Sequence, residues 1–236
     1  MSELESFDGF PAEGLQFLQD LEINNNKEWF QANKKTYETS LLAPAQGFVV
    51  ALGSRLQALD SALVYDPRTD GRGVLMRFYR DTRFSKDKSP YKTNIAGMFT
   101  DGLGKKTERP AYGFHMGAES IELMAGMFKF SKPQLESFRD AVAADQSGEE
   151  LAVALRGLGA EGDYHLVGEH YKRVPAGYDA GQPRANLLRF AGLYVHPTAL
   201  GKRYLTSPDL VDACFTYFSE MAPVYDWLVR YVAIAN

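Results

Sequence analysis

Helical and strand-like patterns occupy separate parts of this chain of 236 residues. Leu15, Leu18 and Leu21 recur at helical spacing near the start, and from residue 64 short segments rich in glycine, aromatic and β-branched residues follow. Helical spacing returns after residue 131. Because strands and helices do not alternate regularly, a parallel sheet of β-α-β units is not expected. The order predicts an α+β fold with N-terminal helices, a central, mainly antiparallel sheet and C-terminal helices.

Three helical segments are expected in the first quarter of the chain. The asparagine run 24–26 interrupts the first of them. Asn25 and Glu28 have the spacing of a capping box, which predicts the start of a second helix. A third is expected from Pro44 to Leu59, since proline is favoured at the first position of a helix.

Later helices are indicated by their start signals. Ser131 and Gln134 flank a proline in capping-box fashion, and another helix is expected over 149–158. The run 207–209 (Ser-Pro-Asp) supplies a capping hydroxyl, a proline and an acid, which predicts the start of the last helix.

The strands are expected in the middle of the chain. The last two of them are joined by a short connection over 117–120, which indicates a hairpin. The region 164–197 is consistent with a short helix that feeds a late strand around 187–195. No linker or repeat is visible, so one domain spanning residues 1–236 is expected. The four expected strands are Val74–Tyr79, Ile95–Phe99, Ala111–Met116 and Ile121–Phe128.

Composition favours a cytoplasmic protein without a membrane segment. Apolar residues make up 45 % of the chain and charged residues 24 %, which are ordinary values for a soluble globular protein. Cys214 is the only cysteine and lies on the apolar stripe of the last predicted helix, so we expect a buried, inert thiol in a reducing compartment. Acidic residues at the start argue against a secretory signal, and no apolar run approaches the length of a membrane span.

Positive charge is concentrated in one short stretch of an acidic chain. Residues 72–92 contain seven basic and two acidic side chains, a net charge of +5. Since the whole chain carries −4, the remainder carries −9. An acidic surface repels long polyanions, whereas a local basic cluster can still bind a small anion. The charge distribution therefore favours a small ligand over a long nucleic-acid footprint.

Residues 77–94 within this stretch read RFYRDTRFSKDKSPYKTN. The pattern resembles R-x-x-R-D-x-R-F-x-x-x-[DN]-K-x-x-Y-K-T-N, the signature of the DUF2461 family of conserved hypothetical proteins, with two residues in place of three between Phe84 and the acidic position. The length, the N-N-N-K-E-W-F run over 24–30 and the closing region are similar to the family as well. The resemblance spans nearly the whole chain but implies no activity, because the family is known by its motif and not by an activity.

The motif itself predicts a cationic site. If an extended strand continues past Tyr79, alternation places Arg80 on the core side with Phe78 and Phe84, where its charge needs Asp81 or Asp87 as a partner. The opposite face then carries Arg77, Tyr79, Asp81 and Arg83.

Pro90 disfavours continuous secondary structure here, so 85–90 is expected to be a loop that brings Lys88 and Lys92 back toward the arginines. Such a cluster offers the fork donors and point charges that bind phosphate or carboxylate. Asp81 is the candidate catalytic residue, as a base or to orient an arginine. The expected ligand-binding residues are Arg77, Arg80, Arg83, Lys88, Tyr91, Lys92 and Asn94.

Three classes of function remain open at this stage. The favoured one is binding of a small anion, such as a phosphorylated metabolite or nucleotide, and whether a reaction follows is left open because no nucleophile and base can be paired. The second is RNA or DNA binding, with Tyr79 and Tyr91 stacking on bases. The third is a structural or protein-interaction role, because arginine–aspartate networks also tie loops together.

Other chemistry is not indicated. The glycines of 102–106 lack the strand and helix that a nucleotide-binding loop needs and fit a hairpin turn better. No metal site is expected, and no cofactor is indicated. The four histidines are scattered through the sequence, at His115, His165, His170 and His196. His115 is expected on the exposed face of its strand with Glu122 on the next.

Overall fold

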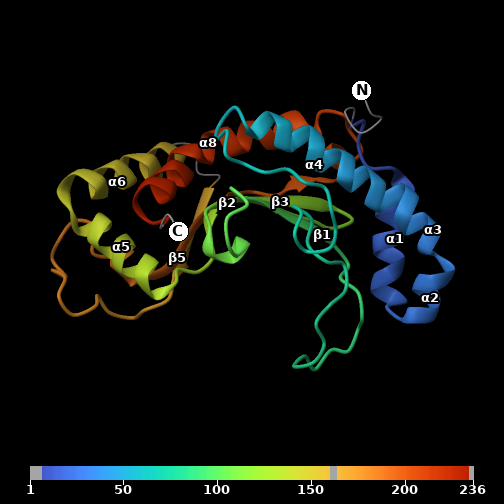
Figure 1. Ribbon diagram of the computed structural model, residues 1–236, viewed down its shortest axis with the longest axis horizontal. Coiled ribbons are helices and arrows are strands. Elements are labelled where there is room, and N and C mark those ends of the chain that lie inside the picture. Colours follow the sequence, from blue (N-terminus) through green and yellow to red (C-terminus); the bar gives the residue numbers. More distant parts are fainter. Residues whose placement is uncertain (1–6, 160–163, 234–236) are drawn as a thin grey trace. The chain divides into compact units, whose positions relative to one another are not determined.

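The computed structural model describes residues 7–159 and 164–233 (Figure 1). It confirms the α+β fold, with N-terminal helices, an antiparallel sheet in the middle and C-terminal helices. The chain divides into two compact units, the first formed by 1–99, 113–123 and 199–216, the second by 100–112, 124–198 and 217–236. The expectation of a single domain stays a prediction.

The helices expected in the first unit are confirmed, with one shift of a cap, and two short helices, α3 (Lys34–Thr36) and α7 (Lys202–Leu205), were not expected. Asn26, not Asn25, caps the second helix, because its side chain accepts a hydrogen bond from the Trp29 N–H at 3.0 Å. The third expected helix is preceded by a π-helical turn, η1. The elements are α1 (Ala12–Ile23), α2 (Lys27–Ala32), α3 (Lys34–Thr36), η1 (Tyr37–Leu42), α4 (Ala43–Leu56), α7 (Lys202–Leu205) and the start of α8 (Leu210–Tyr231).

The sheet follows the strand order β1-β2-β3-β5-β4, and β6 pairs with β3. The expected hairpin is confirmed, since β2 and β3 are neighbours and the Gly117 N–H bonds the Ser120 carbonyl at 3.0 Å. The late strand is confirmed as β5, preceded by a 3₁₀ turn at Leu187–Arg189. The strands are β1 (Ile95–Phe99), β2 (Ala111–Met116), β3 (Ser120–Met127), β4 (Tyr164–Glu169), β5 (Phe190–Pro197) and β6 (Leu200–Gly201).

Two strand predictions differ from the structure. β4 was not expected, because its pairing with β5 is set by tertiary contact across a region rich in glycine and proline. The expected strand Val74–Tyr79 is wrong, since only two isolated bridges form there, Leu75 with Gly97 and Tyr79 with Tyr91. The ladder cannot extend at Arg80, because its partner Pro90 has no N–H to complete the pair.

The second unit packs two antiparallel helices and the end of α8 around aromatic side chains. Tyr112 and Tyr225 stack with centroids 4.3 Å apart, and the Trp227 indole N–H donates to the Ser147 carbonyl at 2.7 Å. The capping box at Ser131 is confirmed. Its helices are α5 (Lys132–Ala143), α6 (Asp145–Gly159), the 3₁₀ turn η2 (Lys106–Glu108) and residues 217–231 of α8. None of the helices over 7–159 and 164–233 is long and apolar enough to cross a membrane.

Gly126 in β3 is required by close backbone packing within the second unit. Its φ is +137°, and a Cβ there would lie 2.2 Å from the Leu193 carbonyl oxygen of β5. We therefore predict that Gly126→Ala lowers the free energy of unfolding by at least about 2 kcal/mol in urea titrations. Gly157→Ala, in the open face of α6, is the matched control and should be neutral or stabilising by up to about 1 kcal/mol. Equal effects of the two substitutions would contradict this account.

Candidate functional site

The basic segment 77–94 forms a long loop of the first unit. In Figure 1 it runs away from β1 without helix or strand before it returns to the sheet. Its two arms contact each other where the Arg80 N–H donates to the Pro90 carbonyl and the Lys92 N–H donates to the Phe78 carbonyl, both at 2.9 Å. The loop therefore depends on contacts with other parts of the unit to hold its position.

Asn25 fixes this loop to the turn between α1 and α2. Its side-chain oxygen accepts from the Tyr91 N–H at 3.1 Å, and its amide nitrogen donates to the Tyr91 carbonyl at 3.0 Å. One side chain thus satisfies both backbone groups of Tyr91, as a neighbouring strand would. This role was not expected from the sequence, in which the spacing of Asn25 and Glu28 indicates a helix cap.

The Tyr91 ring strengthens the same attachment. It stacks on Phe30 of α2 with centroids 4.1 Å apart and an interplanar angle of 17°, and only 2 % of the residue is exposed. Phe78 and Tyr37 pack beside this pair. Burial, followed by the nearby Tyr79 hydroxyl, raises the pKa of Tyr37 to about 12. Tyr37 is therefore neutral at physiological pH.

A polar hollow of about 360 Å³ lies beside this attachment, and we call it the Lys92 hollow. Four residues expected to bind a ligand line it, namely Arg80, Tyr91, Lys92 and Asn94. The other lining residues are Asp87, Ser89 and Thr93 from the motif itself, and Glu22 and Asn25, which only the fold brings to the motif.

Lys92 is the cation of the hollow that forms no ion pair within the described residues. The residue is half-buried, and the loss of solvent around its ammonium lowers its pKa from the usual 10.5. Across the described ranges 7–159 and 164–233, its ammonium has no hydrogen bond or ion pair with another side chain. An anion that enters the hollow would supply the missing partner.

Arg80 lines the hollow as half of an ion pair. Its guanidinium bonds Asp87, which also accepts from the Ser89 hydroxyl at 2.6 Å and the Ser89 N–H at 2.9 Å. These hydrogen bonds, from Ser89 first and then from Arg80, hold the pKa of Asp87 well below its usual range. Asp87, one of the two expected partners, is therefore the one that compensates Arg80.

The other three cations expected to bind a ligand contact partners outside the hollow. Arg77 donates to the Asp70 carbonyl at 3.1 and 2.9 Å. Arg83 pairs with Asp81 at 2.7 Å, and the Lys88 ammonium donates to the Thr82 carbonyl at 2.9 Å. The five expected cations thus do not converge on one cleft: Arg80 and Lys92 do, and the other three do not.

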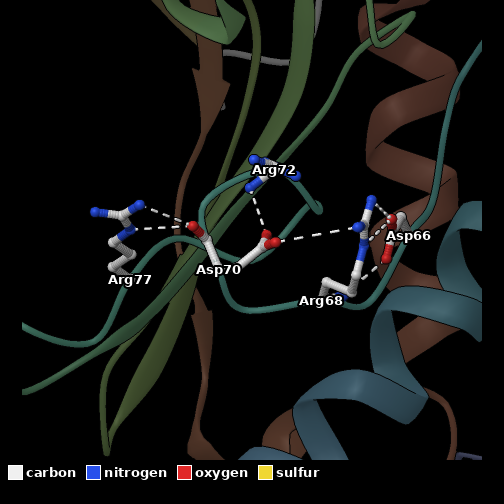
Figure 2. A network of polar contacts seen from close by, with 5 residues as sticks. All are labelled: Asp66, Arg68, Asp70, Arg72 and Arg77. Carbon is white, nitrogen blue, oxygen red and sulfur yellow. Dashed lines mark hydrogen bonds and ion pairs between the residues drawn. The ribbon is translucent and has the colours of Figure 1, made fainter.

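Figure 2 shows how Arg77 joins a polar network in the preceding loop. Arg68 pairs with Asp66 at 2.5 Å, and the Arg72 N–H donates to the Asp70 carboxylate at 2.8 Å. Hydrogen bonds from the following backbone lower the pKa values of both aspartates. The network braces residues 66–77, so Arg77 has a structural role here.

Asp81 and Phe84 lie in solvent. Asp81 accepts from the Arg83 guanidinium, which lowers the pKa of Asp81 to about 2. The prediction that Phe84 lies on the core side with Arg80 is wrong, since Phe84 is 95 % exposed. The extended alternation behind that prediction ends at Pro90 and Arg80, where the arms of the loop separate.

The other expected features lie outside the hollow. His115 is exposed, with its Nδ1 atom 3.8 Å from the Glu122 carboxylate, as expected. Cys214 is buried, which raises the pKa of its thiol and keeps it unreactive. Within 7–159 and 164–233, no group of three or more histidine, cysteine, aspartate and glutamate side chains could hold a metal ion.

Comparison with known proteins identifies one family. The family model described as conserved hypothetical protein, DUF2461, matches residues 13–227, a span that includes the whole basic motif. The comparison with curated proteins found no match.

We predict that Asn25→Ala loosens the loop. The backbone N–H and carbonyl of Tyr91 would lose their partners, so the free energy of unfolding should fall by about 1 to 3 kcal/mol. Limited proteolysis should cut residues 81–89 faster. Asn26→Ala, which removes only the α2 cap, is the control and should leave the cleavage rate in the loop unchanged. Equal cleavage of wild type and Asn25→Ala would contradict the attachment.

Asp81→Asn should leave the fold intact, because the Asp81–Arg83 pair is exposed and screened by solvent. We expect its melting temperature to stay within about 2 °C of the wild type. A drop of more than about 5 °C would show instead that Asp81 compensates a buried cation.

Proposed function

The chain belongs to the DUF2461 family of conserved hypothetical proteins, and we propose that it binds a small anionic ligand in the Lys92 hollow. The class of ligand is a phosphate- or carboxylate-bearing small molecule. The observation that carries the proposal is the half-buried Lys92, which lines a polar hollow and whose ammonium forms no ion pair within the described residues.

The physical argument rests on the cost of leaving a charge partly desolvated. A cation removed from water loses hydration energy, and an opposite charge restores it. The lowered pKa of Lys92 records that loss. A bound anion would offset the desolvation, so the site favours anions.

The surroundings supply the other donors that an anion needs. Arg80 can present N–H groups that its pair with Asp87 does not use, and Thr93 and Asn94 line the same space. A volume of about 360 Å³ suits a small metabolite. Glu22 and Asp87 also line the hollow, so a ligand with both an anionic and a donor group fits better than a bare polyanion.

Binding is the part of the proposal that geometry supports. The described lining includes Ser89 and Asp87, but Asp87 is held ionised by its hydrogen bonds, so it is a poor proton acceptor. We therefore propose ligand binding and leave a reaction out. The single buried cysteine fits a reducing compartment such as the cytoplasm.

RNA or DNA binding is the second candidate, favoured by two exposed rings on the basic loop. Tyr79 is 61 % exposed and Phe84 is 95 % exposed, so both could stack on bases, whereas Tyr91, the second ring expected to stack, is buried and cannot. Arg80 and Arg83, however, are already paired with aspartates. Each phosphate that a protein neutralises on duplex DNA contributes about −0.9 to the salt slope, so the few unpaired cations would give weak, shallow binding.

The test substitutes the lysine of the hollow. Binding of inorganic phosphate and a panel of phosphorylated metabolites is measured by calorimetry and by thermal shift. We predict that Lys92→Met weakens binding of the best ligand about tenfold or more, because a charge-assisted hydrogen bond is lost. Lys86→Met, the same change at an exposed lysine outside the hollow, should leave affinity unchanged. Equal loss of affinity in both variants, or a panel from which no ligand binds the wild type, would contradict the proposal.

Affinity should also depend on pH in a way that reports Lys92. Its ammonium form exists below its pKa, so affinity for sulfate, whose charge is constant, should fall as pH rises through a value below 10.5. Lys92→Arg keeps its charge over this range and should bind with little pH dependence between pH 7.5 and 10.5. Identical pH profiles would show that Lys92 is not the titrating group.

A further inference from the structure

Two of the four histidines become direct neighbours in the second unit. In the antiparallel pair of β4 and β5, His165 lies opposite His196. Their rings are 5.0 Å apart between centroids, with an interplanar angle of 35°. The two residues are 31 positions apart in the sequence, where they read as scattered, and only the unexpected strand β4 brings them together.

The spacing of this histidine pair matches the requirement of a shared metal ion. Metal–nitrogen bonds to imidazole measure about 2.0 to 2.1 Å, so two rings on one ion at a tetrahedral angle have centroids about 5 Å apart. Opposite residues on neighbouring antiparallel strands also point to the same face of the sheet. The spacing and the shared face therefore suit the binding of one ion by both imidazoles.

A hydrogen bond determines which ring nitrogen of His196 carries the proton and which is free to bind a metal ion. Its Nδ1 atom lies 3.2 Å from the Pro197 carbonyl oxygen. A carbonyl can only accept, so the contact requires a proton on Nδ1 and leaves the lone pair of a neutral ring on Nε2. Histidines that bind metals commonly donate their other ring nitrogen in this way, which fixes the ring and makes the ligand more basic.

The pair is open to solvent. His165 is exposed and His196 is half-buried, and Tyr194 lies on the same face with its ring 6.4 Å from His196. Since no cluster of three metal-ligating side chains exists among residues 7–159 and 164–233, water must complete the coordination shell. Imidazole ligands with open positions suit borderline divalent ions such as Zn²⁺, Ni²⁺ and Cu²⁺.

We infer that His165 and His196 form a two-histidine binding site for a divalent transition-metal ion on the exposed face of β4 and β5. The bound ion connects β4 to β5 through two side chains that are 31 positions apart in the sequence. The site is independent of the Lys92 hollow, because all its residues belong to the second unit and the hollow belongs to the first.

The first experiment measures Zn²⁺ and Ni²⁺ binding to the full chain without an affinity tag, by calorimetry at pH 7.5. One ion should bind per chain, and His165→Ala and His196→Ala should each weaken binding about tenfold or more. His170→Ala is the matched control, because His170 lies beyond β4 next to Tyr171, and should bind as the wild type does. No binding to the wild type at millimolar ion, or the same loss in His170→Ala, would overturn the inference.

A second measurement needs no variant. Cu²⁺ should bind most tightly of these ions, and its electron paramagnetic resonance spectrum in the wild-type protein should show two coordinated imidazole nitrogens. A spectrum with one nitrogen or none at one equivalent of copper would overturn the inference, even if the alanine variants fail to fold.

Discussion

The candidate site depends on the contact of Asn25 with Tyr91. The motif loop has no regular strand to hold it, because Pro90 interrupts the ladder that would otherwise join its two arms. One amide side chain satisfies both backbone groups of Tyr91, and the Tyr91 ring stacks on Phe30. This attachment places the residues that follow Tyr91 beside α1 and so forms the Lys92 hollow.

Charge pairing then decides which cations are available. Seven basic residues lie between 72 and 92, but Arg77 serves the network of Figure 2 and Arg83 pairs with Asp81. Arg80 is held by Asp87. Lys92 remains half-buried without a described partner, and its lowered pKa shows the cost of that position. Among the cations that line the hollow, Lys92 is therefore the one without an ion pair in the described residues.

The sequence patterns correctly predicted the features that short-range interactions determine. The capping box at Ser131 and the hairpin after β2 follow from short-range chemistry, and both are confirmed. The features that were not predicted depend on tertiary contacts. The amide of Asn25 meets a residue 66 positions away, and β4 is defined only by its pairing with β5. The strand expected over 74–79 failed because alternation alone does not show which segment will pair with it. Leu75 pairs with Gly97 and Tyr79 pairs with Tyr91, so no continuous ladder forms.

The most direct test follows the lysine ammonium signals of the wild-type protein by nuclear magnetic resonance during titration with inorganic phosphate. The account predicts that the Lys92 signal and the backbone amides of Asn25 and Asn94 shift together and saturate with one dissociation constant. Lys86, exposed on the same loop, should change little. Uniform shifts of all exposed lysines, or shifts centred on Arg83 and Lys88 with none at Lys92, would contradict the assignment of the anion site to the Lys92 hollow.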